Sequence, residues 1–296
     1  MSGASELELQ RWSRGLRGAT VVWVGVAGIG VVALALWLRG AGYYALPLGE
    51  RVDHADYALL SPSRRTGMTY GVVGLGLMLL NLSYLLRRRF PHWPLGRMRL
   101  WLDAHVLTGF LAGLFVLFHS AFQLRSTVAT VTASTLAITL LTGVVGRFFY
   151  AFVPRTESPL RARIDDLDAL LPGVGAALAG TLTAPVEAPP PGAGLWRVLR
   201  ALPGFARVAR ARGRFVHDVC RHRAGGLDPL SSRFVQPLLR EVAQLAARAV
   251  YAVAARELLR AWRPWHRLCA LIMVVGVLLH AGVALFYGYG WHVVAR

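Results

Sequence analysis

The chain has 296 residues, of which 55% are hydrophobic, with a mean hydropathy of +0.47 and a formal net charge of +18. A soluble globular domain of this length is seldom so apolar, which argues against an ordinary soluble enzyme. The two cysteines form no CxxC pair that would indicate a zinc or iron–sulfur site.

Five segments contain no Asp, Glu, Lys or Arg over a length that can cross a membrane. A helix needs about 20 apolar residues to span the hydrocarbon core. Four of the segments are equal in length and the last is longer, and in chain order they are 18–38, 66–86, 104–124, 126–146 and 268–295. We therefore predict an all-α integral membrane protein with five transmembrane helices, the first of them a retained anchor.

The arginines between these segments predict the orientation of the helices. Cytoplasmic loops carry an excess of Arg and Lys. Residues 152–265 contain seventeen Arg and nine acids, and the loop after the second segment contains five Arg and one acid. With both in the cytoplasm, together with residues 1–17, the C-terminus lies outside, and the third and fifth helices run in the same direction. We expect a multi-pass protein of the bacterial inner (plasma) membrane whose charge serves topology rather than nucleic-acid binding.

The resulting organisation has four parts. Residues 1–17 form a cytoplasmic N-terminus, residues 18–151 hold transmembrane helices one to four, and residues 266–296 hold the fifth helix and an outer C-terminus. Residues 152–265 form a helical cytoplasmic insertion, which a Pro-rich linker at 184–194 divides.

The insertion shows amphipathic, basic patterns over 160–171 and 195–215, which predict helices that lie along the membrane surface. A long helical pattern then begins at Pro229 and continues towards Trp262. No nucleotide-binding motif occurs in this segment. It serves either as a docking platform for a partner or as a membrane-associated linker.

Four histidines lie in or at the edge of the third and fifth apolar segments. His105 and His119 stand at positions i and i+14, and His266 and His280 have the same spacing. This spacing makes almost four helical turns, so both members of a pair face the same way, about 21 Å apart. Two parallel helices then offer two pairs of imidazoles at matching depths, and haem iron takes axial ligands from opposite faces. Histidines so far apart along one helix cannot converge on a single zinc ion.

We therefore predict two b-type haems in a four-helix bundle of spans two to five. The inner haem is held by His105 and His266, and the outer haem by His119 and His280. A quinone is a further candidate cofactor.

Small and basic residues near the histidines complete the predicted site. Gly109 and Gly113 leave room for a flat macrocycle on the histidine face. Arg99 and Arg267 are candidate partners for propionates of the inner haem, and Arg125 for the outer haem, although each arginine also suits a purely interfacial role. Asp103 either moves protons at a quinone site or caps its helix, and the cap is the favoured interpretation.

The pattern Ala104-His105 … Phe118-His119 with Trp265-His266 … Leu279-His280 resembles the dihaem four-helix bundle of the cytochrome b family, and ferric-reductase-like membrane domains are similar. The resemblance covers residues 66–146 and 266–288. It implies that the four histidines are axial haem ligands. The Pro-Glu-Trp-Tyr motif of the quinol site is absent, so the quinol chemistry of the bc complex is not implied. No flavin or nicotinamide domain follows the last span, so a self-contained ferric reductase is not implied either.

The expected function is that of an electron-transfer subunit in a larger complex. Its partners would be a cytoplasmic flavoprotein or iron–sulfur subunit, an outer cytochrome c, or membrane quinone. Two alternatives stay open: a quinone-reactive oxidoreductase subunit, and a haem-free membrane scaffold or sensor.

Overall fold

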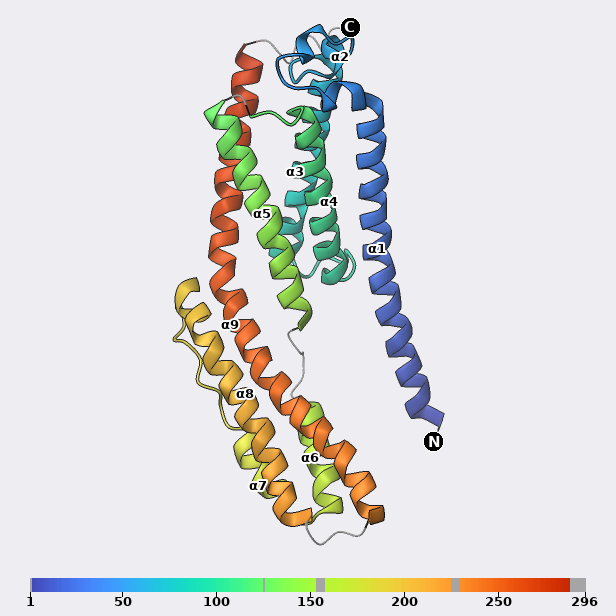
Figure 1. Cartoon of the computed structure of the whole chain (residues 1–296), viewed down its shortest axis with the longest axis vertical. Coiled ribbons are helices and arrows are strands. Elements are labelled where there is room, and N and C mark those ends of the chain that lie inside the picture. The colour runs from blue at the N-terminus through green and yellow to red at the C-terminus, as the bar shows by residue number, and fades with distance from the viewer. Residues whose placement is uncertain (1, 125, 153–157, 225–228, 288–296) are drawn as a thin grey trace. The chain divides into compact units, whose positions relative to one another are not determined.

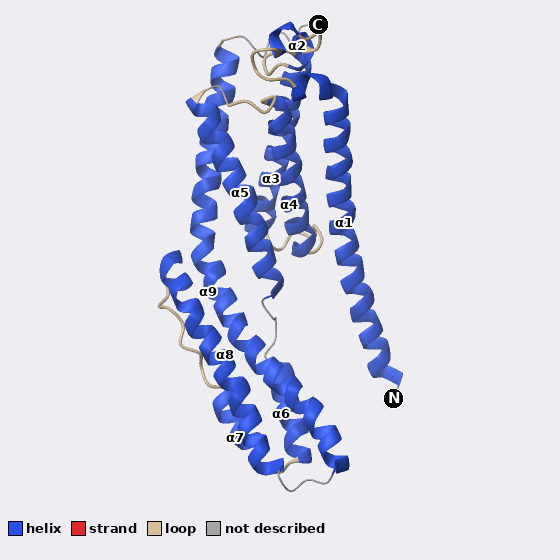
Figure 2. Ribbon diagram, viewed as in Figure 1, coloured by secondary structure: helices blue, strands red, loops and turns tan. Residues whose placement is uncertain are grey.

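The protein is built from helices. A computed structural model describes residues 2–124, 126–152, 158–224 and 229–287, and within these ranges all regular structure is helical (Figures 1 and 2). Five of these helices are long and apolar enough to cross a membrane. The predicted all-α fold with five potential membrane-spanning helices is therefore confirmed.

The helices that contain the five apolar segments are α1 (Ser2–Ala45), α3 (Arg65–Arg89), α4 (Met98–His119), α5 (Thr127–Phe152) and α9 (Pro229–Phe286). A short 3-10 helix, η1 (Arg51–Asp53), and α2 (Tyr57–Leu60) connect α1 to α3. The helices between α5 and α9 are α6 (Ser158–Leu170), α7 (Val174–Leu182) and α8 (Leu195–Ala224).

Two helix boundaries differ from the prediction. The pattern that begins at Pro229 and the fifth apolar segment form one continuous helix of 58 residues, in which Pro237 and Pro264 are accommodated. In contrast, α4 ends at His119, although the apolar run continues to residue 124. The chain turns there because Ala121 and Phe122 adopt left-handed φ angles of 48° and 61°.

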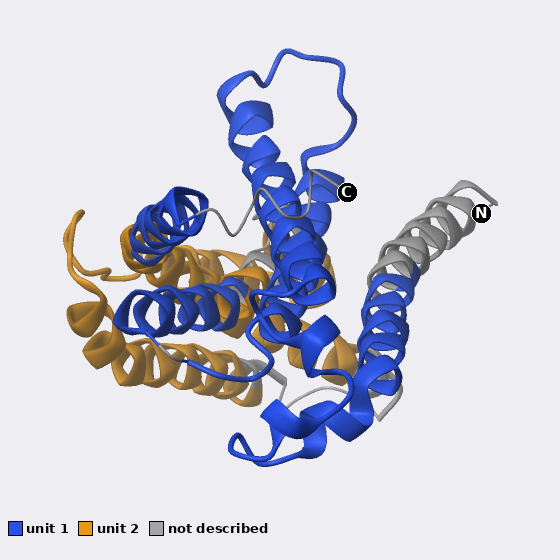
Figure 3. Cartoon of the chain, turned by 90° about the horizontal axis from the view of Figure 1, so that it is seen from above, with its two compact units in different colours: residues 1–143, 269–296 blue, residues 144–268 orange. Residues whose placement is uncertain are grey.

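The chain divides into two compact units (Figure 3). The first comprises Met1–Gly143 and Cys269–Arg296, and the second comprises Val144–Leu268. The unit boundaries therefore fall inside α5 and α9, some residues away from the predicted limits of the insertion at 152 and 265.

The first unit contains a bundle of α3, α4, α5 and residues 269–286 of α9. Helices α3 and α4 form the most extensive helix pair. A Cβ on Gly113 of α4 would lie 2.7 Å from Cδ1 of Leu140 on α5, and a Cβ on Gly276 of α9 would meet Thr132 of α5. Helix α1 packs outside the bundle, against Leu107 of α4. These contacts join spans two to five, with the first span as an addition.

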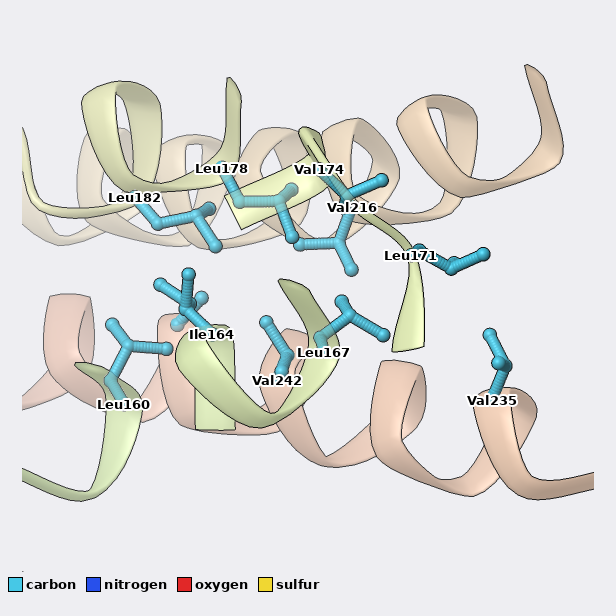
Figure 4. Close-up of a cluster of buried hydrophobic side chains, with 11 residues drawn as sticks. Leu160, Ile164, Leu167, Leu171, Val174, Leu178, Leu182, Val216, Val235 and Val242 are labelled. Atoms are coloured by element: carbon cyan, nitrogen blue, oxygen red, sulfur yellow. The ribbon is translucent and has the colours of Figure 1, made fainter. Parts of the chain in front are cut away.

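The second unit has a hydrophobic core of its own (Figure 4). Leu167, Leu178 and Val242, from α6, α7 and α9, are fully buried in it, and Val216 of α8 is 1% exposed. The amphipathic faces of α6 and α8 are covered by other helices of this unit. Their apolar residues find partners within the insertion itself, and a position along the membrane surface stays a prediction.

Polar contacts support this arrangement. Arg163 of α6 bonds to Asp166 on its own helix and to Glu241 of α9, at 2.8 and 3.0 Å. These hydrogen bonds to carboxylates raise the pKa of Arg163. Arg212 of α8 is buried and donates to the carbonyl of Ala184, and its desolvation lowers its pKa.

Candidate functional site

Two of the predicted ligands meet in the first unit. The ring centroids of His119, at the end of α4, and His280, on α9, lie 6.2 Å apart, with an angle of 79° between the ring planes. In Figure 1 α4 and this part of α9 run in the same direction, as predicted. His119 is half-buried and His280 is exposed.

The ring of His119 is oriented by α3. Its Nδ1 lies 2.8 Å from the carbonyl oxygen of Gly67. A carbonyl can only accept, so the proton of the neutral ring lies on Nδ1 and the lone pair is on Nε2. This leaves Nε2 as the atom that can bind a metal, which is the usual role of a hydrogen bond on the other ring nitrogen.

Glycines let α3 come this close to His119. A Cβ on Gly71 would lie 2.8 Å from Nδ1 of His119. A Cβ on Gly67 would meet the backbone of Ser61. Position 71 therefore needs glycine if the imidazole is to reach the carbonyl, and position 67 needs glycine if the start of α3 is to pack against the backbone of Ser61.

His105 has a corresponding partner one layer further along the bundle. Its Nδ1 lies 3.3 Å from the carbonyl oxygen of Asn81 on α3. The side chain of Asn81 in turn donates from Nδ2 to the carbonyl oxygen of His105, at 2.6 Å, and to Oγ1 of Thr108, at 3.2 Å. Tyr84 covers the ring, with centroids 4.9 Å apart.

The two layers follow the same register. Gly67 and Asn81 on α3 have the same spacing in the sequence as His105 and His119 on α4. Antiparallel helices keep such a pairing over successive turns, since both advance by the same rise per residue. The two α3 carbonyls are thus separated by the same number of residues as the two histidines that they orient.

The separation between the rings of His119 and His280 is that expected of two axial ligands of one haem iron. Two imidazoles that bind one ion from opposite sides, with metal–nitrogen bonds of about 2 Å, place their ring centres roughly 6 Å apart. Rotation about this axis leaves the angle between the ring planes unrestricted. Helix α4 packs extensively against α3, and the ring contact between His119 and His280 joins α4 to residues 269–286 of α9.

The donor set of this layer consists of two imidazoles. Within the described ranges, no three His, Cys, Asp or Glu side chains gather closely enough to hold a metal ion by themselves. Two imidazoles suit an iron whose remaining ligands belong to a porphyrin.

His266, the fourth predicted ligand, lies on α9 in the second unit. Its ring stacks on Trp262, with centroids 4.7 Å apart and 29° between the planes. His105 belongs to the first unit. The pairing of His105 with His266 therefore stays a prediction.

The remaining predicted site residues fall into two groups. A Cβ on Gly109 would lie 3.1 Å from Nδ2 of Asn81, so Gly109 faces a side chain of α3, and Gly113 faces Leu140 of α5. Arg99 and Arg267 are exposed, on the first turn of α4 and on α9. Arg125 lies outside the described residues. The roles of all five beside a cofactor stay predictions.

Asp103 does not cap its helix. Helix α4 begins at Met98, with Arg97 in the capping position, so Asp103 is in the second turn. It is 6% exposed. The interpretation as a cap is wrong because the helix starts before the charge-free segment does.

The residues that orient the histidines were not predicted from the sequence. Asn81 is an amide within an apolar span, and intramembrane polar side chains often bond to a neighbouring helix, so this signal was available. Gly67 and Gly71 resemble many other glycines in the chain. Arg51 is also new: it is 7% exposed and donates to the carbonyls of Tyr44, Leu46 and Ala121, at 2.7 to 2.8 Å.

Comparison of the chain with protein-family models, with curated proteins and with solved structures finds no match.

Proposed function

We propose that this chain is a membrane electron-transfer subunit that holds two b-type haems and passes electrons between the two sides of the membrane. The observation that carries the proposal is the approach of His119 and His280 to a ring separation of 6.2 Å. When bound, each haem iron takes up and releases one electron.

The chain's own residues hold the two layers in place. The carbonyls of Gly67 and Asn81 accept from Nδ1 of His119 and His105, so both rings present Nε2 in one tautomer. Such bonds increase the basicity of an imidazole ligand and fix its orientation. The layers are about 21 Å apart along α4, from the rise of a helix.

The proposal includes a redox partner on the cytoplasmic side and one on the outer side, or membrane quinone in place of either. The exposed arginines of helix α8 support the proposal of a cytoplasmic partner. Within the described residues none of its exposed arginines forms an ion pair, and these are Arg197, Arg200, Arg207, Arg210, Arg214 and Arg221. Four of them recur every seven residues, so they follow one side of the helix. A partner with an acidic docking face would complement this row.

The test is the absorbance spectrum of the full chain purified from haem-replete cells. The reduced-minus-oxidised spectrum should show b-type haem at about two haems per chain. His119→Ala and His280→Ala should each remove the same component, and His105→Ala and His266→Ala the other. His92→Ala, in an exposed loop position, is the matched control. A colourless wild type, or both components intact in His119→Ala, would contradict the proposal and favour a haem-free scaffold.

Asp103 favours a second candidate, a quinone-reactive subunit. It is a buried carboxyl group two residues before His105, and intramembrane carboxyl groups are candidates for proton transfer. Asp103→Asn should then slow haem reduction by a quinol without loss of haem. Unchanged reduction rates in that variant, measured by stopped flow, would leave the electron conduit as the function.

A further inference from the structure

A cavity of about 560 Å³ lies in the second unit, between the Pro-rich linker, the start of α8 and the last turns of α9 before the apolar segment. Its volume falls within the roughly 300–1,000 Å³ of small-molecule sites. Pro190, Val198, Ala261 and Leu268 give it largely apolar walls. Val198 and Ala261 are also part of a small buried cluster with Leu258, so the wall is packed from behind.

One acidic and one basic residue line this largely apolar cavity. Glu257 is 9% exposed, and its Oε1 accepts from Arg260 at 2.7 Å. Arg260 also lines the cavity, and its side chain is 62% exposed. Burial of a carboxylate is costly unless it is fully paired. Among the described residues no second group bonds to Glu257, so its Oε2 has capacity for a donor.

The cavity lies where α9 begins its apolar run. Leu268, on its wall, is the first residue of the fifth segment without charged side chains. Trp265 also lines the cavity and is 54% exposed, and Trp196, near the start of α8, is 72% exposed. Exposed tryptophans are typical of the level of lipid headgroups. An occupant would therefore come from the bilayer.

We propose that this cavity binds the headgroup of a zwitterionic phospholipid with a primary ammonium group, that is, a phosphatidylethanolamine. The ammonium donates to Glu257, the phosphate accepts from Arg260, and the glycerol end lies on the apolar wall. An anionic phosphatidylglycerol would bring no cation to Glu257, and the trimethylammonium of a phosphatidylcholine has no N–H to donate.

The test is native mass spectrometry of the full chain in detergent with an equimolar mixture of phosphatidylethanolamine, phosphatidylcholine and phosphatidylglycerol. The wild type should retain one phosphatidylethanolamine in about tenfold preference to the others. Glu257→Gln and Arg260→Gln should each lose the preference. Arg256→Gln, exposed on the same helix, should keep it.

A further variant keeps the test decisive if the charge variants do not fold. Ala261→Leu fills the cavity without a change of charge and should abolish the bound lipid. Equal retention of the three lipids, or a preference for phosphatidylglycerol, would overturn the proposal. So would competition by soluble glycerophosphoethanolamine at the same concentration as the lipid, because a lipid site must use the bilayer end of the molecule. The site does not depend on haem, so a haem-free preparation should bind the same lipid.

Discussion

The Nδ1 atom of His119 lies 2.8 Å from the carbonyl oxygen of Gly67, far earlier in the chain. This bond decides which nitrogen of the imidazole can bind a metal, and it directs that nitrogen away from α3. The predicted role of His119 therefore depends on the close approach of α3. Substitutions on α3 can test this role without replacing the histidine itself.

The first prediction concerns Gly71. A methyl group at this position would lie 2.8 Å from Nδ1 of His119, so Gly71→Ala should displace the ring and broaden or shift the low-spin signal of the outer haem in electron paramagnetic resonance. The inner signal should not change. Gly76→Ala on the same helix is the control, since a Cβ there has nothing within 4 Å. It should leave both signals intact and stabilise α3 by up to about 1 kcal/mol.

The second prediction concerns Asn81. Its side chain donates to the carbonyl of His105 and to Thr108, so Asn81→Leu removes two hydrogen bonds, worth about 0.5–1.5 kcal/mol each. The midpoint potential of the inner haem should shift, because the loop of bonds between Asn81 and His105 is broken, while the outer potential stays constant. A redox titration of both components measures this. An equal shift of both haems would mean that Asn81 acts only through overall stability.

The third prediction concerns Arg51, which holds the turn that follows His119. The carbonyl of Ala121 accepts from Arg51 at 2.7 Å, and Ala121 has a left-handed φ of 48°. Such a conformation costs about 1–3 kcal/mol for a residue other than glycine, so it needs support from its surroundings. Arg51→Leu also leaves the carbonyls of Tyr44 and Leu46 without their donor.

We expect Arg51→Leu to lower the free energy of unfolding by at least about 3 kcal/mol and to weaken the outer haem signal before the inner one. Thermal denaturation in detergent, followed by helical circular dichroism and by haem absorbance, measures both effects. Arg64→Leu, an exposed arginine in the same connection between α1 and α3, is the control. If the two variants unfolded at the same temperature, the proposed support by Arg51 would be disproved.

The fourth prediction concerns the core of the second unit. Leu167→Ala should destabilise this unit by about 2–5 kcal/mol, because Leu167 of α6 is fully buried in a core that it shares with residues of α7 and α9. Leu170→Ala, on the same helix but 50% exposed, should have little effect. Hydrogen exchange of the amides in 160–182 reports the difference. Equal protection in both variants would show that the amphipathic helices are not held by this core.

Some of the candidate site is predictable from spacing. His105 and His119 stand out because the spacing i, i+14 brings two side chains to the same side of a helix, and this depends only on the regular rise and rotation of the backbone. The close approach of His119 and His280 is consistent with that inference. The partner carbonyls of Gly67 and Asn81 are not predictable in this way, since every residue has a carbonyl and nothing local indicates which one an imidazole will reach.

The sequence by itself determined the number of helices that can span a membrane and their positions, because a stretch of about 20 residues without charge has few stable alternatives in lipid. Only the tertiary structure decided where α4 ends, that α9 is one helix across the apolar boundary, and that the insertion buries its apolar faces within itself. These features arise from contacts between segments far apart in the chain, such as Arg51 with Ala121 and Leu167 with Val242. The periodicity of apolar residues indicates which side of a helix is apolar, but it does not indicate which segment covers that side.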